Sequence, residues 1–220
     1  MRLRNIPRAA EVVWNHRMVI RDPFEHRGNW RQLFGNDQPL HIEIGMGKGQ
    51  FLLQMARLHP SVNYIGVERY HSVLLRALEK FDTEEFKGLE NIRFLCVDAA
   101  RLPEVFVKGE IAKIYLNFSD PWPKAKHAKR RLTSNEFLVR YEQILADGGA
   151  LEFKTDNTGL FQFSLDQIQN AKAWNLNQYT FDLHREEEMK RGNVMTEYEQ
   201  KFSAMGNPIH KLIASLKMER

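Results

Sequence analysis

Cysteine is nearly absent from this sequence. The single residue, Cys96, excludes an internal disulfide, and it lies in the apolar run IRFLCV, where a small buried side chain is expected. Because structural buried cysteines are inert, we predict a packing role for Cys96 and no reactive nucleophile. A chain with one cysteine also fits a reducing compartment, and we predict a cytoplasmic location.

Long apolar runs and metal-binding patterns are missing as well. No apolar stretch approaches the ~18 residues that a membrane span requires. The first residues, MRLRNIPRAAEVVW, lack the apolar core of a secretory signal. The histidines are isolated, and no His or Cys pair has the spacing of a zinc site. We therefore expect neither a membrane segment nor a bound metal.

Acidic residues are scarce in two segments of a chain whose net charge is only +4. Residues 121–131 contain five cations and no acid, and residues 1–31 contain three acids against a set of arginines. These arginines are Arg2, Arg4, Arg8, Arg17, Arg21, Arg27 and Arg31. Basic segments on an otherwise balanced body indicate a polyanionic partner, and arginine favours nucleic acid. A solvated basic surface is the alternative.

Short strands alternate with helices from residue 40 onward. The hydrophobic periodicity predicts strands at 40–45, 63–68, 91–98, 112–118 and 150–156, helices at 51–59, 72–81, 135–149 and 160–171, and two final strands at 174–183 and 209–217 without a full crossover pattern between them. Repeated strand–helix units predict an α/β fold with a parallel sheet that helices cover on both faces. The length of 220 residues predicts one domain at 36–220 that follows a basic N-terminal arm at 1–35.

A glycine-rich turn follows the first predicted strand in HIEIGMGKGQF. Gly45, Gly47 and Gly49 occupy alternate positions after Glu43. Glycine allows the backbone to approach a ligand closely at a strand-to-helix turn. The dinucleotide fingerprint G-x-G-x-x-G would place its third glycine at position 50, where this chain has Gln50. The turn alone is weak evidence, since glycine also serves purely local geometry.

Acids end the next strands of the predicted sheet. Parallel sheets bind ligands beyond the carboxyl ends of their strands, and Glu68 and Asp98 follow the second and third strands. A carboxylate at Glu68 could accept both hydroxyls of a ribose, or it could be a solvated strand end that pairs with Arg69. Asp98 could contact a ligand or cap a turn that begins at Ala99.

The stretch FSDPWPKAKHAKRR, residues 118–131, follows the fourth predicted strand. Its one acid, Asp120, precedes two prolines that restrict the backbone. Trp122 between those prolines could stack on a base or pack in the core. The cations that follow could contact phosphates, which fix the register of a nucleic acid without reading its sequence.

The pattern E-x-G-x-G-x-G, followed by acids after the second and third strands, resembles the class I S-adenosylmethionine-dependent methyltransferases. That resemblance implies a single Rossmann-like domain with a seven-stranded, mostly parallel sheet, a C-terminal antiparallel hairpin and helices on both faces. The stretch 118–131 closely resembles the signature of the bacterial tRNA (guanine-N7)-methyltransferases. FKTDN at 153–157 and TEYEQKF at 196–202 match that family too, so the resemblance spans essentially the whole chain.

The resemblance implies S-adenosyl-L-methionine as the cofactor and tRNA as the partner, with methylation at N7 of a variable-loop guanosine, nucleotide 46. The implied cofactor-binding residues are Glu43, Gly45, Gly47, Gly49, Glu68, Asp98 and Asp120, and Asp120 is also the implied catalytic residue. The implied substrate-binding residues are Lys124, Asp156, Thr196, Glu197, Tyr198 and Glu199. The implied RNA-binding residues are Lys126, His127, Ala128, Lys129, Arg130 and Arg131.

Structural alternatives accompany two of these motifs. Thr196 and Glu199 have the spacing of a capping box for a helix that runs to about Met205. Asp156 could cap the helix that begins near Asn157. Two other functions also fit part of the pattern, namely a nicotinamide-dependent oxidoreductase and a non-catalytic RNA-binding module on the same fold. The sequence is compatible with a homodimer and does not fix the oligomeric state.

Overall fold

The computed structural model describes residues 6–218 and divides into two compact units, residues 1–107 and residues 108–220. We call them the first and the second unit. Their strands belong to one seven-stranded sheet with the order β3-β2-β1-β4-β5-β7-β6. This order, with antiparallel strands at the C-terminal end of the chain, confirms the predicted fold class.

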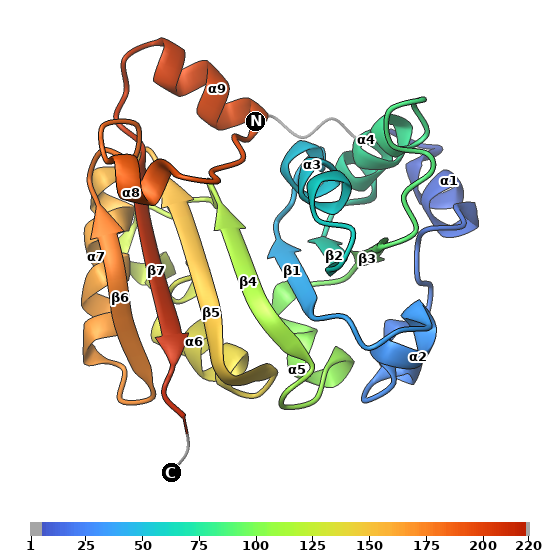
Figure 1. The fold of residues 1–220 in the computed structure, drawn as a ribbon, viewed down its shortest axis with the longest axis horizontal. Helices are drawn as coiled ribbons and strands as arrows, with labels where there is room; N and C mark the ends of the chain where they lie inside the picture. The colour runs from blue at the N-terminus through green and yellow to red at the C-terminus, as the bar shows by residue number, and fades with distance from the viewer. Residues whose placement is uncertain (1–5, 219–220) are drawn as a thin grey trace. The chain divides into compact units, whose positions relative to one another are not determined.

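The first unit contains three strands and the helices around them (Figure 1). Its elements are α1 (Ala9–Asn15), η1 (Pro23–His26), α2 (Trp30–Phe34), β1 (Leu40–Ile44), α3 (Gln50–Leu58), β2 (Asn63–Glu68), α4 (His71–Phe81), β3 (Ile92–Cys96), η2 (Ala99–Arg101) and α5 (Leu102–Val105). β2 pairs in parallel with both β1 and β3, and every residue of β2 is buried. The predicted strands and helices between residues 40 and 98 are therefore confirmed.

The described part of the N-terminal segment, from residue 6 onward, packs on α4 and β3 of the first unit. α1 lies against α4, and Val19 forms a parallel bridge with Phe94 of β3. The Trp30 side chain is 1% exposed, and its indole nitrogen donates a hydrogen bond to the carbonyl oxygen of Val105 at 3.0 Å. Among the arginines of this segment, Arg27 donates to the carbonyl oxygen of Pro103 at 3.1 Å. Arg2 and Arg4 lie outside the described residues.

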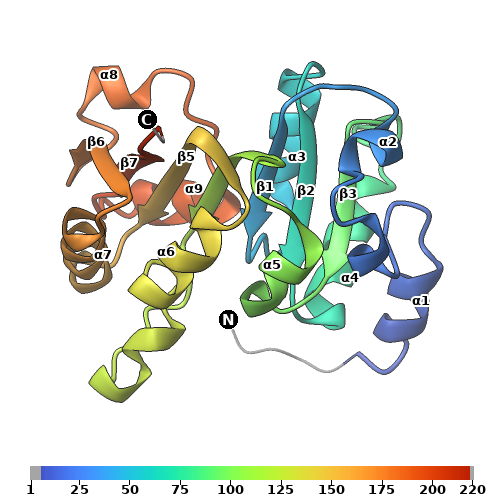
Figure 2. The ribbon, with the colours of Figure 1, turned by 90° about the horizontal axis from the view of Figure 1, so that it is seen from below.

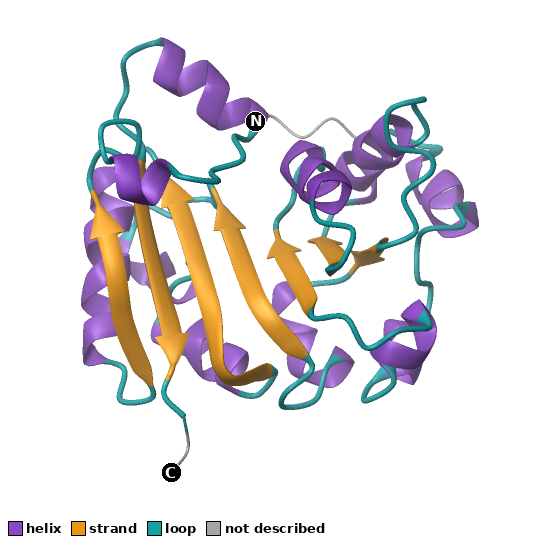
Figure 3. Cartoon of the chain, in the orientation of Figure 1, coloured by secondary structure: helices purple, strands orange, loops and turns teal. Residues whose placement is uncertain are grey.

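The second unit carries the C-terminal part of the sheet (Figure 3). Its elements are β4 (Ile111–Asn117), η3 (Ala125–Arg130), α6 (Asn135–Glu142), β5 (Leu145–Thr155), α7 (Thr158–Asn170), β6 (Trp174–Thr180), α8 (Glu187–Lys190), α9 (Glu197–Ala204) and β7 (His210–Leu216). β4 and β5 are parallel, whereas β7 runs antiparallel to both β5 and β6. The predicted antiparallel pair at the end of the chain is confirmed.

The prediction of one helix over 135–149 is wrong in its C-terminal half. α6 ends at Glu142, and β5 begins at Leu145. Leu145 pairs with Ile111, after which the register shifts so that Ala150 pairs with Lys113. The glycines of this stretch therefore belong to an irregular part of the strand, where Gly148 has φ +71°, and they do not end the helix.

The strands of the second unit have helices on both faces. Figure 2 shows α6 and α7 on one face of these strands and α8 on the other. A small apolar cluster of Leu183, Met189 and Ile209 anchors the connection that contains α8 and α9, and Phe118 packs against this cluster. No helix within residues 6–218 is long and apolar enough to cross a membrane.

Candidate active site

The glycine turn of the first unit connects β1 to α3. Gly47 has φ +59°, and a Cβ atom added there would meet no heavy atom within 4 Å, so the space beside this backbone is open. Gly49 has φ +73°, and an added Cβ would lie 3.0 Å from the Cβ of Ala77 on α4. Glycine is therefore needed at the two positions for different reasons. At Gly47 the open space leaves room for a ligand, whereas at Gly49 the missing side chain permits close packing of the helices.

Glu68 ends β2 with a buried carboxylate that is held by backbone. Oε1 accepts hydrogen bonds from the N–H groups of Arg69 at 2.8 Å and Tyr70 at 3.1 Å, and Oε2 accepts one from Gly47 at 3.3 Å. Burial raises the pKa of Glu68, and the three backbone N–H groups oppose that rise. The expected alternative, a solvated strand end, is wrong because the side chain is buried.

Asp98 follows β3 and acts as a cap. Its Oδ1 accepts a hydrogen bond from the backbone N–H of Ala100 at 2.9 Å, which confirms the capping interpretation. Its Oδ2 lies 3.4 Å from Nη1 of Arg69, the residue that the alternative interpretation paired with Glu68. Capping uses one oxygen, so the half-buried carboxylate retains acceptor capacity for a ligand.

The residues of the first unit fit a nucleoside cofactor. Glu68 presents an Oε2 whose one hydrogen bond, to Gly47, is long, and the Gly47 backbone beside it faces open space. Glu43, near the end of β1, is buried, and Gly45 directly after the strand has φ +73°. Cys96 is partly buried, and burial together with the nearby Glu68 raises the pKa of its thiol to about 11, which disfavours the thiolate.

In the second unit, the loop after β4 holds Asp120 in an unusual backbone. Phe118 has φ +52° and Trp122 has φ +43°, both in the left-handed region that non-glycine residues rarely adopt. Each such residue costs roughly 1–3 kcal/mol and persists only where its surroundings fix it. Asp120 lies between them with an exposed side chain, available to a ligand.

The basic residues of this loop fall into two groups. Lys124, Lys126, Lys129 and Arg130 are exposed, although Lys129 also forms an ion pair with Glu136 at 3.3 Å. Residues 125–130 form η3, a turn of helix that the sequence did not predict.

The remaining members of the predicted RNA-binding stretch are partly covered. His127, Ala128 and Arg131 are half-buried, and the guanidinium of Arg131 donates to the carbonyl oxygens of Pro121 and Trp122. Trp122 itself is half-buried, with the Arg130 guanidinium 5.0 Å from its ring and the His127 ring at 5.7 Å.

Asp156 follows β5 and does not cap α7. The cap is Asn157, whose side chain accepts a hydrogen bond from the N–H of Leu160 at 2.8 Å. The predicted capping role of Asp156 is therefore wrong. Partial burial raises the pKa of the Tyr198 phenol, and the negative charge of Asp156 adds to the rise. The charge of Asp156 therefore acts on Tyr198, and both residues belong to the predicted substrate-binding set.

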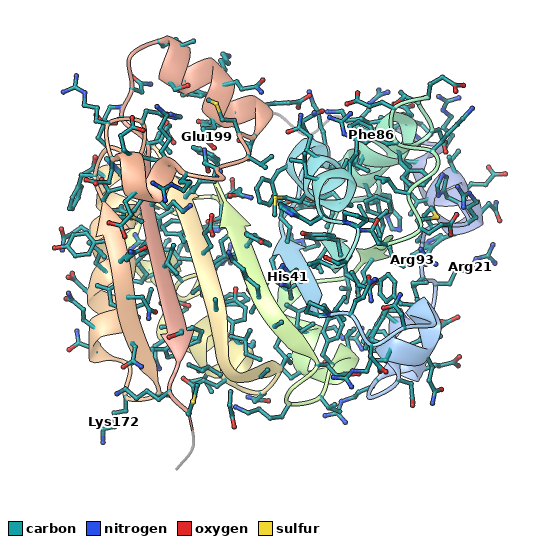
Figure 4. The ribbon with its side chains drawn as sticks, viewed as in Figure 1. Arg21, His41, Phe86, Arg93, Lys172 and Glu199 are labelled. Carbon is teal, nitrogen blue, oxygen red and sulfur yellow. The ribbon has the colours of Figure 1, made fainter. Side chains whose placement is uncertain are left out.

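The TEYE motif begins α9, and its two ends have different environments. Thr196 caps the helix, because its Oγ1 accepts a hydrogen bond from the N–H of Glu199 at 2.9 Å. The helix ends at Ala204, before Gly206 with φ +82°, as predicted. The Glu199 side chain (Figure 4) is fully buried, and its Oε2 lies 2.6 Å from Nζ of Lys154.

Three residues of the second unit escaped sequence analysis. Lys154 of FKTDN is fully buried and also donates to the carbonyl oxygen of Val194 at 2.9 Å. Phe118 packs against Tyr198, with ring centroids 4.8 Å apart, and so links the Asp120 loop to α9. Asn193 donates to Oε1 of Glu199 at 2.7 Å. The only signal in the sequence was the lysine of FKTDN, Lys154, within a predicted strand. Its position in the strand does not tell whether the ammonium group is buried in an ion pair or exposed to solvent.

Comparison with known proteins places these features in a family. A family model described as "Putative methyltransferase" matches residues 37–212. The tRNA (guanine-N(7)-)-methyltransferase of Lachnoclostridium phytofermentans is 53% identical over 100% of both chains, and that of Lysinibacillus sphaericus is 52% identical over 96% of both. Among solved structures, a 16S rRNA methyltransferase, KamB, matches with a TM-score of 0.64 at 14% identity, over 86% of this chain and 93% of its own, which shows a shared fold. The chain belongs to the tRNA (guanine-N(7)-)-methyltransferase family.

Proposed function

We propose that this protein transfers a methyl group from S-adenosyl-L-methionine to N7 of a guanosine in tRNA, at nucleotide 46 of the variable loop. The observation that carries the proposal is the 53% identity with a tRNA (guanine-N(7)-)-methyltransferase over the full length of both chains. The exposed Asp120 in the loop after β4 and the buried Glu68 at the end of β2 support the proposal.

The first unit is proposed to hold the cofactor. When bound, S-adenosyl-L-methionine supplies an electrophilic methyl group on a sulfonium. The Glu68 carboxylate accepts hydrogen bonds from the ribose hydroxyls, for which Oε2 keeps acceptor capacity. Asp98 would contact the adenine, and the backbone at Gly47 leaves space for the ligand. Glu43, Gly45 and Gly49 are the other residues of the first unit in the proposed cofactor set.

Asp120 is proposed to serve the methyl acceptor. N7 of guanine has a lone pair and no proton, so it attacks the methyl carbon without a base to activate it. Methylation makes the guanine ring cationic, and a fixed carboxylate beside the ring stabilises the charge that develops in the transition state. The same carboxylate can accept from the N1 and amino hydrogens of guanine, which adenine does not offer in that arrangement.

The rest of the second unit is proposed to bind the RNA. Lys124, Lys126, Lys129 and Arg130 expose their cations after the Asp120 loop, where they can contact phosphates. Asp156, Tyr198 and the start of α9 lie near one another and are proposed to position the substrate nucleotide. His127 and Ala128 belong to the same proposed RNA-contacting stretch.

Three broader proposals accompany this activity. Residues 1–35 act as a basic arm of a methyltransferase domain at 36–220, although the described part of the arm packs on the first unit. The protein works in the cytoplasm. A homodimer is proposed as its assembly, and sedimentation velocity at several protein concentrations would test this, because a single monomeric species throughout would contradict it.

The direct test is to incubate the protein with labelled S-adenosyl-L-methionine and unmodified tRNA and to map the product by cleavage at 7-methylguanosine. We expect label at one variable-loop guanosine. Label on another base, or no transfer, would contradict the proposed function. A protein that bound the tRNA and left it unmethylated would instead support a non-catalytic RNA-binding module.

The role of Asp120 is tested in the same assay. We expect Asp120→Ala to lower methyl transfer by at least about 100-fold, the loss seen when one group that stabilises transition-state charge is removed. The fold should be unaffected because the side chain is exposed. Asp166→Ala, at an exposed acid of α7 in the same unit, is the matched control and should retain activity. Activity retained by Asp120→Ala would exclude a catalytic role for this residue.

A further inference from the structure

The loop between β4 and η3 cannot fix its own backbone. Phe118 and Trp122 both have positive φ, and such a conformation persists only where the surroundings impose it. Pro121 and Pro123, on either side of Trp122, have no N–H group, so the usual hydrogen bonds of a turn are missing at those positions. Contacts with residues outside the loop therefore have to maintain this conformation, as the hydrogen bond from the Phe118 N–H to the carbonyl oxygen of Lys154 does at 2.8 Å.

The Arg131 side chain holds two carbonyl groups of this loop. Its Nε donates to the carbonyl oxygen of Pro121 at 3.0 Å, and its Nη2 donates to the carbonyl oxygen of Trp122 at 3.1 Å. A guanidinium presents its donors in a rigid planar fork, which suits two neighbouring acceptors. Arg131 therefore bridges the two residues that directly follow Asp120.

The guanidinium of Arg131 is itself fixed from the other side. Its Cζ lies 4.3 Å from the centre of the Phe163 ring on α7. The residues after Arg131 are also tied to α7, because the hydroxyls of Thr133 and Ser164 lie 2.6 Å apart and both side chains are buried. The loop, Arg131 and α7 thus form one connected arrangement within the second unit.

Within residues 6–218, the neighbouring cations Lys129 and Arg130 do not share the two hydrogen bonds that Arg131 donates to carbonyl groups of the loop. Arg130 is exposed and lies over the Trp122 ring at 5.0 Å, and Lys129 is exposed and pairs with Glu136. A phosphate can approach either side chain from solvent. The half-buried guanidinium of Arg131, in contrast, already uses donors on backbone carbonyls.

We propose that Arg131 is a positioning residue that holds the Asp120 loop in its strained conformation, and that it does not contact phosphate. The inference rests on the proposed role of Asp120. It separates the basic run into cations that bind RNA and one cation that shapes the site. Loss of Arg131 should therefore reduce the rate of methyl transfer more than the affinity for tRNA.

The test compares Arg131→Ala and Arg131→Lys in kcat, in the dissociation constant for tRNA and in its salt dependence. We expect both variants to lower kcat, Arg131→Ala by about 100-fold, the loss that a displacement of about 1 Å at a reacting group causes. Lysine should rescue poorly, because one ammonium cannot reproduce the planar fork that bridges both carbonyls. The dissociation constant and its salt dependence should stay close to those of the unmodified protein.

Arg140 supplies the matched control. It also donates to a backbone carbonyl, that of Glu136, and it lies over the Phe137 ring at 5.1 Å, yet it belongs to α6 and not to the loop. We expect Arg140→Ala to keep its kcat, and melting temperatures of all variants identify any that fail to fold. If Arg131→Ala unfolds, Arg131→Lys still decides the question.

Three results would overturn the inference. One is a kcat of Arg131→Lys equal to that of the unmodified protein. The second is a fall in tRNA affinity with a salt slope smaller by about 0.7–0.9, the change for one lost phosphate contact. The third is an unchanged kcat in Arg131→Ala. Failure of the proposed function is distinguishable, because it would appear as an inactive unmodified protein or an active Asp120→Ala variant. An active protein that needs Asp120 and tolerates Arg131→Ala would reject only the present proposal.

Discussion

The acids at the strand ends of the first unit hold the local backbone, and they are also proposed to bind the cofactor. Asp98 caps a turn through Oδ1 and lies near Arg69 through Oδ2, and Glu68 accepts three backbone N–H groups. The structure confirms the cap formed by Asp98, and its contact with the cofactor stays a proposal. A substitution that preserves the cap and removes the charge separates the two tasks.

Asp98→Asn is that substitution. Asparagine caps about as well as aspartate, so the unfolding free energy of the unliganded protein should change by only a few tenths of a kcal/mol. If the carboxylate contacts the adenine, calorimetry should show S-adenosylhomocysteine binding about ten-fold more weakly, a loss of ~1.4 kcal/mol. Asn157→Asp, the reverse exchange at the cap of α7, is the control and should leave binding unchanged. Unaltered binding by Asp98→Asn would reduce this residue to its cap.

Residue types at strand ends were predictable because a parallel sheet directs its ligand groups to one edge. The partners of those residues were less predictable. Asp156 and Asn157 are both good caps, and only the backbone geometry at the start of α7 selects Asn157. The role of Arg131 was also hidden, since a cation within KAKHAKRR has the same local sequence whether it faces solvent or a carbonyl group.

At the level of elements, α8 and α9 cover strands whose charged residues would otherwise face water. In β5, Glu152 and Lys154 alternate with Leu151 and Phe153, and all four are buried. An alternating strand normally predicts one solvated face. That expectation fails here because the connection between β6 and β7 folds back onto the strands, a contact between distant segments that local periodicity does not encode.

The pair of Lys154 and Glu199 attaches α9 to β5, and its removal should destabilise the protein. Burial lowers the pKa of Lys154, and the adjacent Glu199 carboxylate opposes that effect. Glu199→Gln leaves a buried ammonium without its counter-charge and should lower the unfolding free energy by about 3–5 kcal/mol in urea titrations. Glu197→Gln, at an exposed position on the same helix, should have little effect.

A double substitution tests whether the pair or the single charge matters. Lys154→Met with Glu199→Leu removes both charges, and replacing a whole buried pair with apolar side chains is often neutral. We expect the double variant to recover most of the stability that Glu199→Gln loses. If Glu199→Gln is as stable as the unmodified protein, Glu199 does not anchor α9, and its predicted contact with substrate would regain support.

Glu152 makes the stability of the protein depend on pH. Burial alone would raise its pKa, but Lys113 at 2.8 Å and Lys211 at 3.0 Å outweigh burial and lower the pKa to about 2. A carboxyl whose pKa is lowered on folding stabilises the protein above its unfolded pKa of about 4.5, and this contribution is lost as the pH falls towards 2. The shift corresponds to roughly 3 kcal/mol.

Glu152→Gln should therefore be less stable than the unmodified protein at pH 7, and the difference should shrink between pH 4.5 and about 2. Urea midpoints measured across this range for both proteins provide the test. Glu186→Gln, at an exposed position before α8, is the control and should follow the unmodified protein at every pH. A stability difference that stayed constant with pH would show that Glu152 does not stabilise the protein through its charge.

For the whole molecule, the distribution of charge matters more than its sum. A net charge of +4 is small for an RNA-binding protein, whereas residues 121–131 alone contribute five cations. A local cluster of cations neutralises phosphates and releases counterions, so the logarithm of the affinity falls linearly with the logarithm of the salt concentration. The slope of this line is about −0.7 to −0.9 for each phosphate contact. The salt slope therefore reports how many phosphates the protein contacts, and substitutions show which cations do so.

The double variant Lys126→Ala with Arg130→Ala should bind tRNA more weakly and with a salt slope smaller by about 1.4–1.8, because two phosphate contacts are lost. The control is Lys172→Ala with Lys217→Ala, which removes the same charge elsewhere in the second unit. Lys172 lies at the end of this unit opposite α9 (Figure 4), and Nζ of Lys217 donates to the carbonyl oxygen of Lys172 at 2.6 Å. Equal slopes for the two double variants would mean that only the total charge acts at long range. A smaller slope for the first variant alone would place the phosphate contacts beside the Asp120 loop, where the guanosine that receives the methyl group has to be held.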